Sequence, residues 1–153
     1  MARFRDPRLT NLTGSSDNGS WVIEGGTLSN PQPTFSGDPL FTGHYTVIGN
    51  LCHFAIDVDM DNILTFGTGQ YFMKLPFASN HNIVVSDGCL HDDSTGNQYA
   101  ILGHVVEGSD IMTLFSIGSN GQHIPFSDSD NQPIKLQTVD SFHIAGTFEL
   151  EHS

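Results

Sequence analysis

The sequence predicts an all-β fold, an antiparallel two-sheet sandwich that is jelly-roll-like and carries an extended N-terminal arm. One observation is the composition: 153 residues include 16 Gly, 7 Pro and 11 Phe, and the helix formers Lys and Glu are scarce. A second is the pattern, since eight to ten extended segments follow one another at spacings of about 8 to 12 residues without a helical period. At this length the chain is expected to form one domain with a real core.

The first twenty residues are expected to lie outside the sandwich. Residues 1–10 have no apolar period that would fold them against a domain, and residues 11–20 are rich in Gly, Ser and Asn, which is typical of a linker. We therefore predict an arm and linker over residues 1–20 and a sandwich domain over 21–153. Short extended pieces at 21–24 and 34–36 are expected at its edge, because Gly and Pro residues interrupt this region.

The clearest strand covers residues 52–60, where Cys, Phe, Ile, Val and Met alternate with His, Ala and Asp. An extended segment at 44–48 precedes it, and the Gly49-Asn50 pair between them predicts a tight hairpin. A strand at 70–75 should end at Pro76, which cannot donate to a sheet ladder.

Further strands are expected at 82–90, 98–106 and 110–117, the last two as a hairpin. A long acidic loop should follow over 118–132, because it contains Asn120-Gly121 and several Asp and Ser residues. A short strand at 134–137 and a long amphipathic strand at 141–150 complete the predicted sandwich.

The basic residues are distributed very unevenly. The chain has five of them against 17 acidic residues, a net charge of −12, and Arg3, Arg5 and Arg8 all fall in the first eight positions. An acidic domain does not suit nucleic acid or an anionic membrane as a partner, since phosphate contacts need clustered Lys and Arg. The basic arm either docks on another protein or packs on its own acidic domain. No apolar run is long enough for a membrane span or a signal peptide.

Neither the cysteines nor the histidines show a recognisable metal-binding spacing. Cys52 falls on the apolar phase of a strand, which indicates a small buried side chain rather than a disulfide. His53 and His143 fall on polar strand faces, as expected of surface or interface histidines. Asp57, Asp59 and Asp61 resemble the start of a calcium loop, but the Gly and Glu that such a loop requires are missing, so we expect no metal and no cofactor.

No enzyme motif occurs in the sequence. It has no G-x-S-x-G elbow and no glycine-rich phosphate loop between a strand and a helix. Trp21 is expected to anchor a core or an interface rather than to serve as a sugar platform. We therefore predict a protein without catalytic residues.

Four segments resemble a small β domain found in structural proteins of tailed bacteriophages. They are residues 43–51 (GHYTVIGNL), 69–77 (GQYFMKLPF), 124–126 (IPF) and 142–149 (FHIAGTFE), the last with Phe148 at a position where the family pattern has a tyrosine. The resemblance implies a virion protein with a trimeric jelly-roll and lends no catalytic residues.

That resemblance and the charge pattern together predict a capsid decoration, or cement, protein on the outer surface of a phage particle, made in the host cytoplasm. The arm would bind the major capsid protein or another virion protein, and a homotrimer would multiply a weak contact into firm attachment. Arg3, Arg5 and Arg8 would pair with carboxylates while Phe4 and Leu9 are buried.

Two alternatives remain open at this point. The chain could be the receptor-binding tip of a short tail fibre or spike, with the loops at 91–97 and 118–132 recognising a host glycan or protein. It could also be a β-sandwich enzyme or sugar-binding module that uses its histidines. Fold analogy does not decide between them.

Overall fold

The computed structural model describes residues 16–21, 24–37 and 40–150. All the helices and strands assigned in this part of the chain are β-strands. No helix among these residues could cross a membrane. The strands are β1 (Ser16–Trp21), β2 (Gly25–Thr27), β3 (Thr34–Phe35), β4 (Leu40–Ile48), β5 (Leu51–Asp59), β6 (Ile63–Thr65), β7 (Tyr71–Lys74), β8 (Ile83–Asp92), β9 (Asn97–Val105), β10 (Ile111–Ile117), β11 (His123–Pro125) and β12 (Ser141–Glu149).

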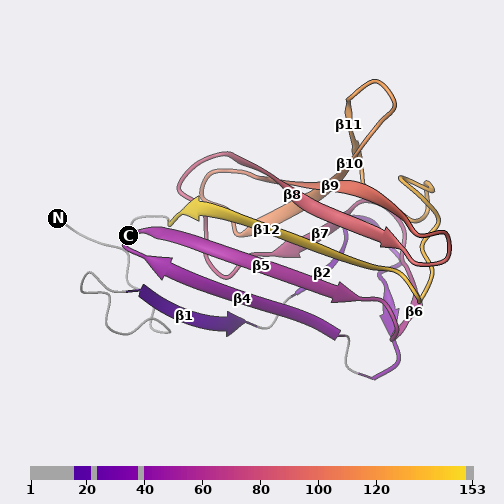
Figure 1. Cartoon of the computed structure of the whole chain (residues 1–153), viewed down its shortest axis with the longest axis horizontal. Coiled ribbons are helices and arrows are strands. Elements are labelled where there is room, and N and C mark those ends of the chain that lie inside the picture. Colours follow the sequence, from indigo (N-terminus) through magenta and orange to yellow (C-terminus); the bar gives the residue numbers. More distant parts are fainter. Residues whose placement is uncertain (1–15, 22–23, 38–39, 151–153) are drawn as a thin grey trace.

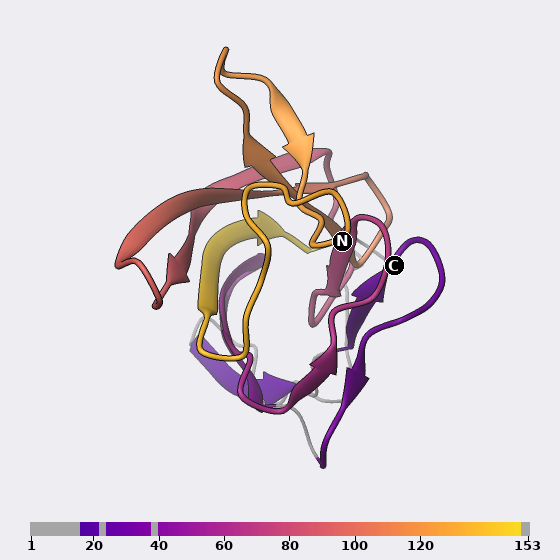
Figure 2. The same cartoon turned by 90° about the vertical axis from the view of Figure 1, so that its right-hand side faces the viewer.

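Ten of these strands form one antiparallel sheet in the order β1-β4-β5-β12-β8-β9-β10-β7-β2, with β11 paired to β10, while β3 and β6 form a separate pair. Figure 1 shows the long strands lying side by side, and Figure 2, which looks along them, shows the sheet curling around a common interior. The all-β, sandwich-like prediction is confirmed. Its two layers are the two halves of one continuous curled sheet, and β12 links them by pairing with β5 on one side and β8 on the other.

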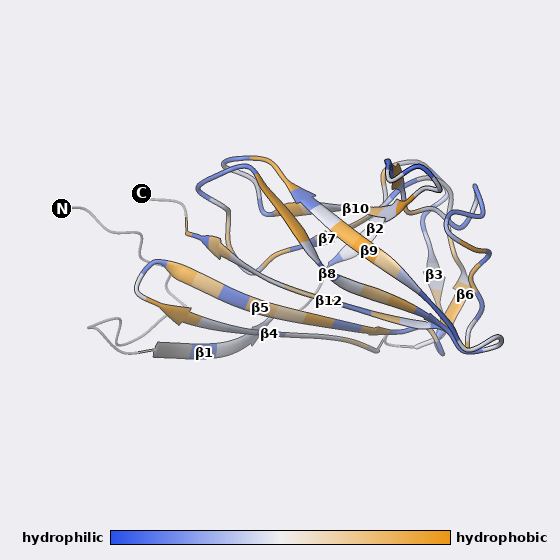
Figure 3. Cartoon of the chain, turned by 45° about the horizontal axis from the view of Figure 1, so that its top comes forward, coloured by the Kyte–Doolittle hydropathy of each residue, from blue (hydrophilic) through white to orange (hydrophobic). Residues whose placement is uncertain are grey.

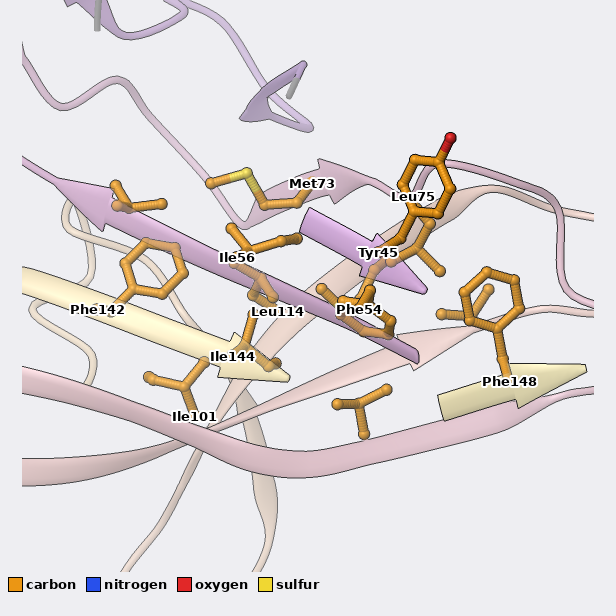
Figure 4. Packing of buried hydrophobic residues seen from close by; sticks show 14 of the residues in the cluster. Tyr45, Phe54, Ile56, Met73, Leu75, Ile101, Leu114, Phe142, Ile144 and Phe148 are labelled. Carbon is orange, nitrogen blue, oxygen red and sulfur yellow. The ribbon is translucent and has the colours of Figure 1, made fainter. Parts of the chain in front are cut away.

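The period-two pattern explains why β5 and β12 bury one face against the other layer. Every second residue of β5 from Cys52 to Val58 is buried, and on β12 Phe142, Ile144 and Phe148 are buried. Figure 4 shows these side chains meeting residues of β4, β7, β9 and β10 between the layers. Cys52 is buried and free, as expected, and its burial raises the pKa of the thiol to about 12.

Aromatic contacts join the four segments that resemble the phage domain. The rings of Tyr45 and Phe77 pack edge to face with centroids 5.1 Å apart, which links the first segment to the second. Phe126 packs in the same way on Phe142 at 5.7 Å and links the third segment to the fourth. The aromatic residues of these segments that make the contacts, Tyr45, Phe77, Phe126 and Phe142, are all buried.

The N-terminal boundary of the sheet differs from the expected one. Residues 16–20, predicted as linker, form most of β1, which pairs with β4 from Ser16↔Ile48 to Trp21↔Gly43. Backbone pairing needs no apolar side chains, so the polar composition concealed the strand. Gly19 is required here, because a Cβ at this position would overlap the ring of Tyr45.

Two expectations for the C-terminal third were wrong. The loop predicted at 118–132 contains β11, which extends β10 into a hairpin that projects from the molecule (Figures 1 and 2). The strand predicted at 134–137 is irregular, since the carboxylate of Asp128 holds this segment by accepting a 2.7 Å hydrogen bond from the backbone N–H of Leu136. The Asp128 side chain thus accepts the hydrogen bond that a neighbouring strand would accept from Leu136 in a sheet.

Candidate functional site

The predicted arm contacts Arg3, Phe4, Arg5, Arg8 and Leu9 lie outside the described residues. The arm therefore stays a prediction from charge and composition, and the candidate sites below come from residues 16–21, 24–37 and 40–150.

The outer face of β5 and β12 is polar, as the alternation predicted. His53 is exposed and its Nδ1 lies 2.7 Å from Thr147 Oγ1, while His143 is also exposed and its ring centroid lies 5.7 Å from that of His91. The carboxylate of Asp59 accepts a hydrogen bond from the N–H of Asp61 at the end of the strand. In the described part of the chain, His, Cys, Asp and Glu do not gather in groups of three or more that could hold a metal ion.

A polar pocket of about 460 Å³ lies at the seam where the two ends of the curled sheet approach each other. β1 contributes Trp21, whose indole Nε1 donates a 3.0 Å hydrogen bond to the carbonyl of Lys74 on β7. This bond crosses the seam, and the indole packs at a tilt on Tyr45, so Trp21 is an anchor, as expected from the sequence. The residues lining this seam pocket are Ser20, Trp21, Glu24, Lys74, Leu75, Pro76 and Asp110.

Backbone hydrogen bonds connect the segments that carry the charged residues of the seam pocket. Lys74 N donates to the carbonyl of Glu24, and Leu75 N donates to the carbonyl of Asp110. The ammonium of Lys74 lies 3.6 Å from the Glu24 carboxylate, and both side chains are substantially exposed. The pocket thus presents one cation, two carboxylates and an aromatic edge on a rigid frame, a combination that suits a polar ligand with several hydroxyl groups.

A second cluster lies on the outer face of the opposite half of the sheet, and sequence reasoning missed it. His104 Nε2 on β9 lies 2.9 Å from His123 Nδ1 on β11, and the ring of His104 stacks on Phe115 of β10 with centroids 4.1 Å apart. Burial and the neighbouring His123 lower the pKa of His104 below its usual value. The sequence analysis did not predict β11. Without that strand, nothing in the sequence indicates that His104 and His123 lie close together.

Apolar side chains surround this histidine pair. Val84 and Ile117 are exposed although they are large hydrophobic residues, and Leu102 lies opposite Phe115 in the ladder. Figure 3 shows hydrophobic stretches on β8 and β9, whereas the turns at the strand ends are hydrophilic. Exposed Val84 and Ile117 make this outer face less polar than that of β5 and β12, where His53, Asp57 and His143 are exposed.

No protein-family model matches the chain, and no curated protein is significantly similar to it. Among solved structures, the chain is similar to the crystal structure of the Dettilon tailspike protein, with a TM-score of 0.61 over 88% of this chain and 18% sequence identity. The match covers 24% of the tailspike chain, so this chain spans about a quarter of that protein's length. At this identity the similarity shows a shared fold.

Proposed function

We propose that this chain is a non-enzymatic structural domain of a bacteriophage virion, belonging to a tail spike or fibre and exposed on the particle surface. The observation that carries the proposal is the fold shared with a tailspike protein over 88% of the chain. The four sequence segments that resemble structural proteins of tailed bacteriophages also support it. Of the two virion roles considered from the sequence, the tail-associated one has the stronger support.

The seam pocket suits the recognition task of such an appendage. A volume of about 460 Å³ could hold one or two sugar rings, and exposed Glu24 and Lys74 side chains can exchange hydrogen bonds with hydroxyl groups. The edge of Trp21 adds an apolar surface beside them. The ligand class we assign to the seam pocket is therefore a host surface glycan.

Location on the particle tests the proposed function directly. Gold-labelled antibodies against the purified chain should decorate the tail tip or baseplate of intact virions in electron micrographs. Labelling spread over the head, or absent from particles that contain the chain by mass spectrometry, would contradict a tail role.

Substitutions in the seam pocket test the ligand assignment separately. Lys74→Gln and Asp110→Asn change charge with little change in size, and we expect each to weaken binding of the purified protein to host cells by about tenfold, or about 1.4 kcal/mol. Asp57→Asn, on the exposed face of β5, is the matched control and should bind like the wild type. Unchanged binding by both pocket variants would refute the glycan assignment while leaving the virion location intact.

The capsid decoration role depends on the charge asymmetry of the N-terminal arm and is kept as the second candidate. Deleting residues 1–12 should abolish binding of the protein to phage heads if the arm anchors it to a capsid protein. Full binding by the shortened chain would exclude the arm as an anchor. The homotrimer predicted together with this role can be measured by sedimentation equilibrium of the full chain.

A further inference from the structure

We infer that His104 and His123 form a two-ligand binding site for a divalent transition metal ion such as Cu²⁺, Ni²⁺ or Zn²⁺. The inference is independent of the proposed virion role. It starts from the position of two ring nitrogens, one on β9 and one on β11, that face each other across the outer surface of the sheet.

The distance between these nitrogens suits two adjacent ligands of one ion. Metal–imidazole bonds are about 2.0–2.1 Å long, so two nitrogens at the right angle of a square-planar Cu²⁺ or Ni²⁺ site lie about 2.9 Å apart, whereas around a tetrahedral Zn²⁺ ion they lie about 3.3 Å apart. His104 Nε2 and His123 Nδ1 are 2.9 Å apart. In the metal-free protein one of these nitrogens donates its N–H to the other. To bind a metal ion, the donating ring changes tautomer, so that its proton moves to its other ring nitrogen, and both rings rotate slightly outward to direct their lone pairs at the ion.

The fold holds the His104 ligand in place before any metal binds. Its strand lies between β8 and β10, its carbonyl accepts a 3.3 Å hydrogen bond from Thr113 Oγ1, and its ring stacks on Phe115 with an angle of 28° between the planes. A ligand fixed by packing loses little conformational entropy on binding, which favours affinity. His123 is exposed, so an ion can approach from solvent.

The surroundings also favour the neutral imidazole, which is the form that binds metal. The ladder places Val84 of β8 and Thr113 of β10 directly opposite His104, and neither of these side chains carries a charge. The net charge of −12 further raises the local concentration of cations around the molecule.

Two imidazoles leave positions in the coordination shell that water or a donor from another molecule would fill. Imidazole nitrogen is a good ligand for Cu²⁺, Ni²⁺ and Zn²⁺ and a poor one for Mg²⁺ or Ca²⁺. Affinity should accordingly follow the order Cu²⁺ above Ni²⁺ and Zn²⁺, with no measurable binding of Ca²⁺.

Isothermal titration of the full, untagged chain with NiCl₂ and with CuCl₂ at pH 7.5 tests the site. The wild type should bind one ion per chain, and His104→Gln, His123→Gln and the double variant should each weaken binding at this site by at least about tenfold, because a chelate needs both rings. Each single variant should bind the metal ion as weakly as the double variant does. Melting temperatures without metal establish that each variant is folded, and exposed His123 offers the substitution least able to disturb the core.

A second histidine pair provides the matched control. His91 on β8 and His143 on β12 also have neighbouring rings, with centroids 5.7 Å apart, at a different place in the sheet. The double variant of these two residues should bind Ni²⁺ like the wild type. Equal titrations for the wild type and the His104/His123 double variant, or loss of binding in the control alone, would overturn the inference. In the wild type, paramagnetic Ni²⁺ should broaden the ring resonances of His104 and His123 before those of His91 and His143.

Discussion

Replacing Phe126 by Ala is expected to lower the free energy of unfolding by about 3–5 kcal/mol, the range for removing a buried phenylalanine ring from a core. Phe126 is fully buried and packs edge to face on both Tyr71, at 5.0 Å, and Phe142, at 5.7 Å. Its backbone also joins β10 and β7, since Phe126 N donates to Leu114 O and Phe126 O accepts from Tyr71 N. Loss of the ring therefore leaves a cavity, and the backbone hydrogen bonds to β10 and β7 prevent these strands from moving closer to fill it.

A cavity already present beside Phe126 would merge with the space left by the ring, so rearrangement of the neighbouring side chains would fill even less of it. Phe126 already borders an apolar space of about 50 Å³ between the layers, together with Phe41, Met60 and Phe142. Urea unfolding followed by fluorescence and circular dichroism measures the loss, and for a domain of this size the melting temperature should fall by about 6–20 °C. Val84→Ala, at an exposed position of β8, is the control and should change stability by less than about 1 kcal/mol. Equal effects of the two substitutions would show that Phe126 is not a central packing residue.

The strands that the sequence predicted well are those whose burial alternates on one face. β5 and β12 combine period-two hydrophobicity with a long uninterrupted ladder, so the pattern in residues 52–60 and 141–150 carried enough information. β1 and β11 did not show this pattern, because each lies at the margin of the sheet and is held mainly by backbone pairing. The fold class was therefore predictable, whereas the sheet margins were not.

The candidate sites were less predictable because they depend on those margins. Trp21 and Lys74 are 53 positions apart and meet because the sheet curls until its two ends approach. His104 and His123 meet because β11 folds back along β10, which places it within reach of β9. Neither pair of residues has a fixed short spacing in the sequence. Motifs for catalytic or metal-binding residues therefore could not reveal either site. The charge pattern of the arm was visible in the sequence and awaits the deletion experiment.

Replacing Asp128 by Ala should cost about 2–4 kcal/mol of stability, most of it through one backbone group. The Asp128 side chain is buried, and its Oδ1 accepts a 2.7 Å hydrogen bond from the buried N–H of Leu136 while its Oδ2 lies 2.7 Å from Lys135 Nζ. Alanine would leave the Leu136 N–H without a partner in a place that water reaches poorly, and such a loss costs more than an average hydrogen bond contributes.

Two further substitutions separate the hydrogen bond of Asp128 from its ion pair. Lys135→Ala removes the ion pair alone, and because the Lys135 side chain is 65% exposed we expect a loss below about 1 kcal/mol. Asp128→Asn keeps an oxygen that can accept from Leu136 N and should fall between the two. Urea unfolding of the three variants gives the ranking, and amide hydrogen exchange at Leu136 should be accelerated far more by Asp128→Ala than by Lys135→Ala. If Lys135→Ala were as damaging as Asp128→Ala, the ion pair would hold residues 134–137 in place, and the backbone hydrogen bond could no longer explain why this segment forms a loop instead of a strand.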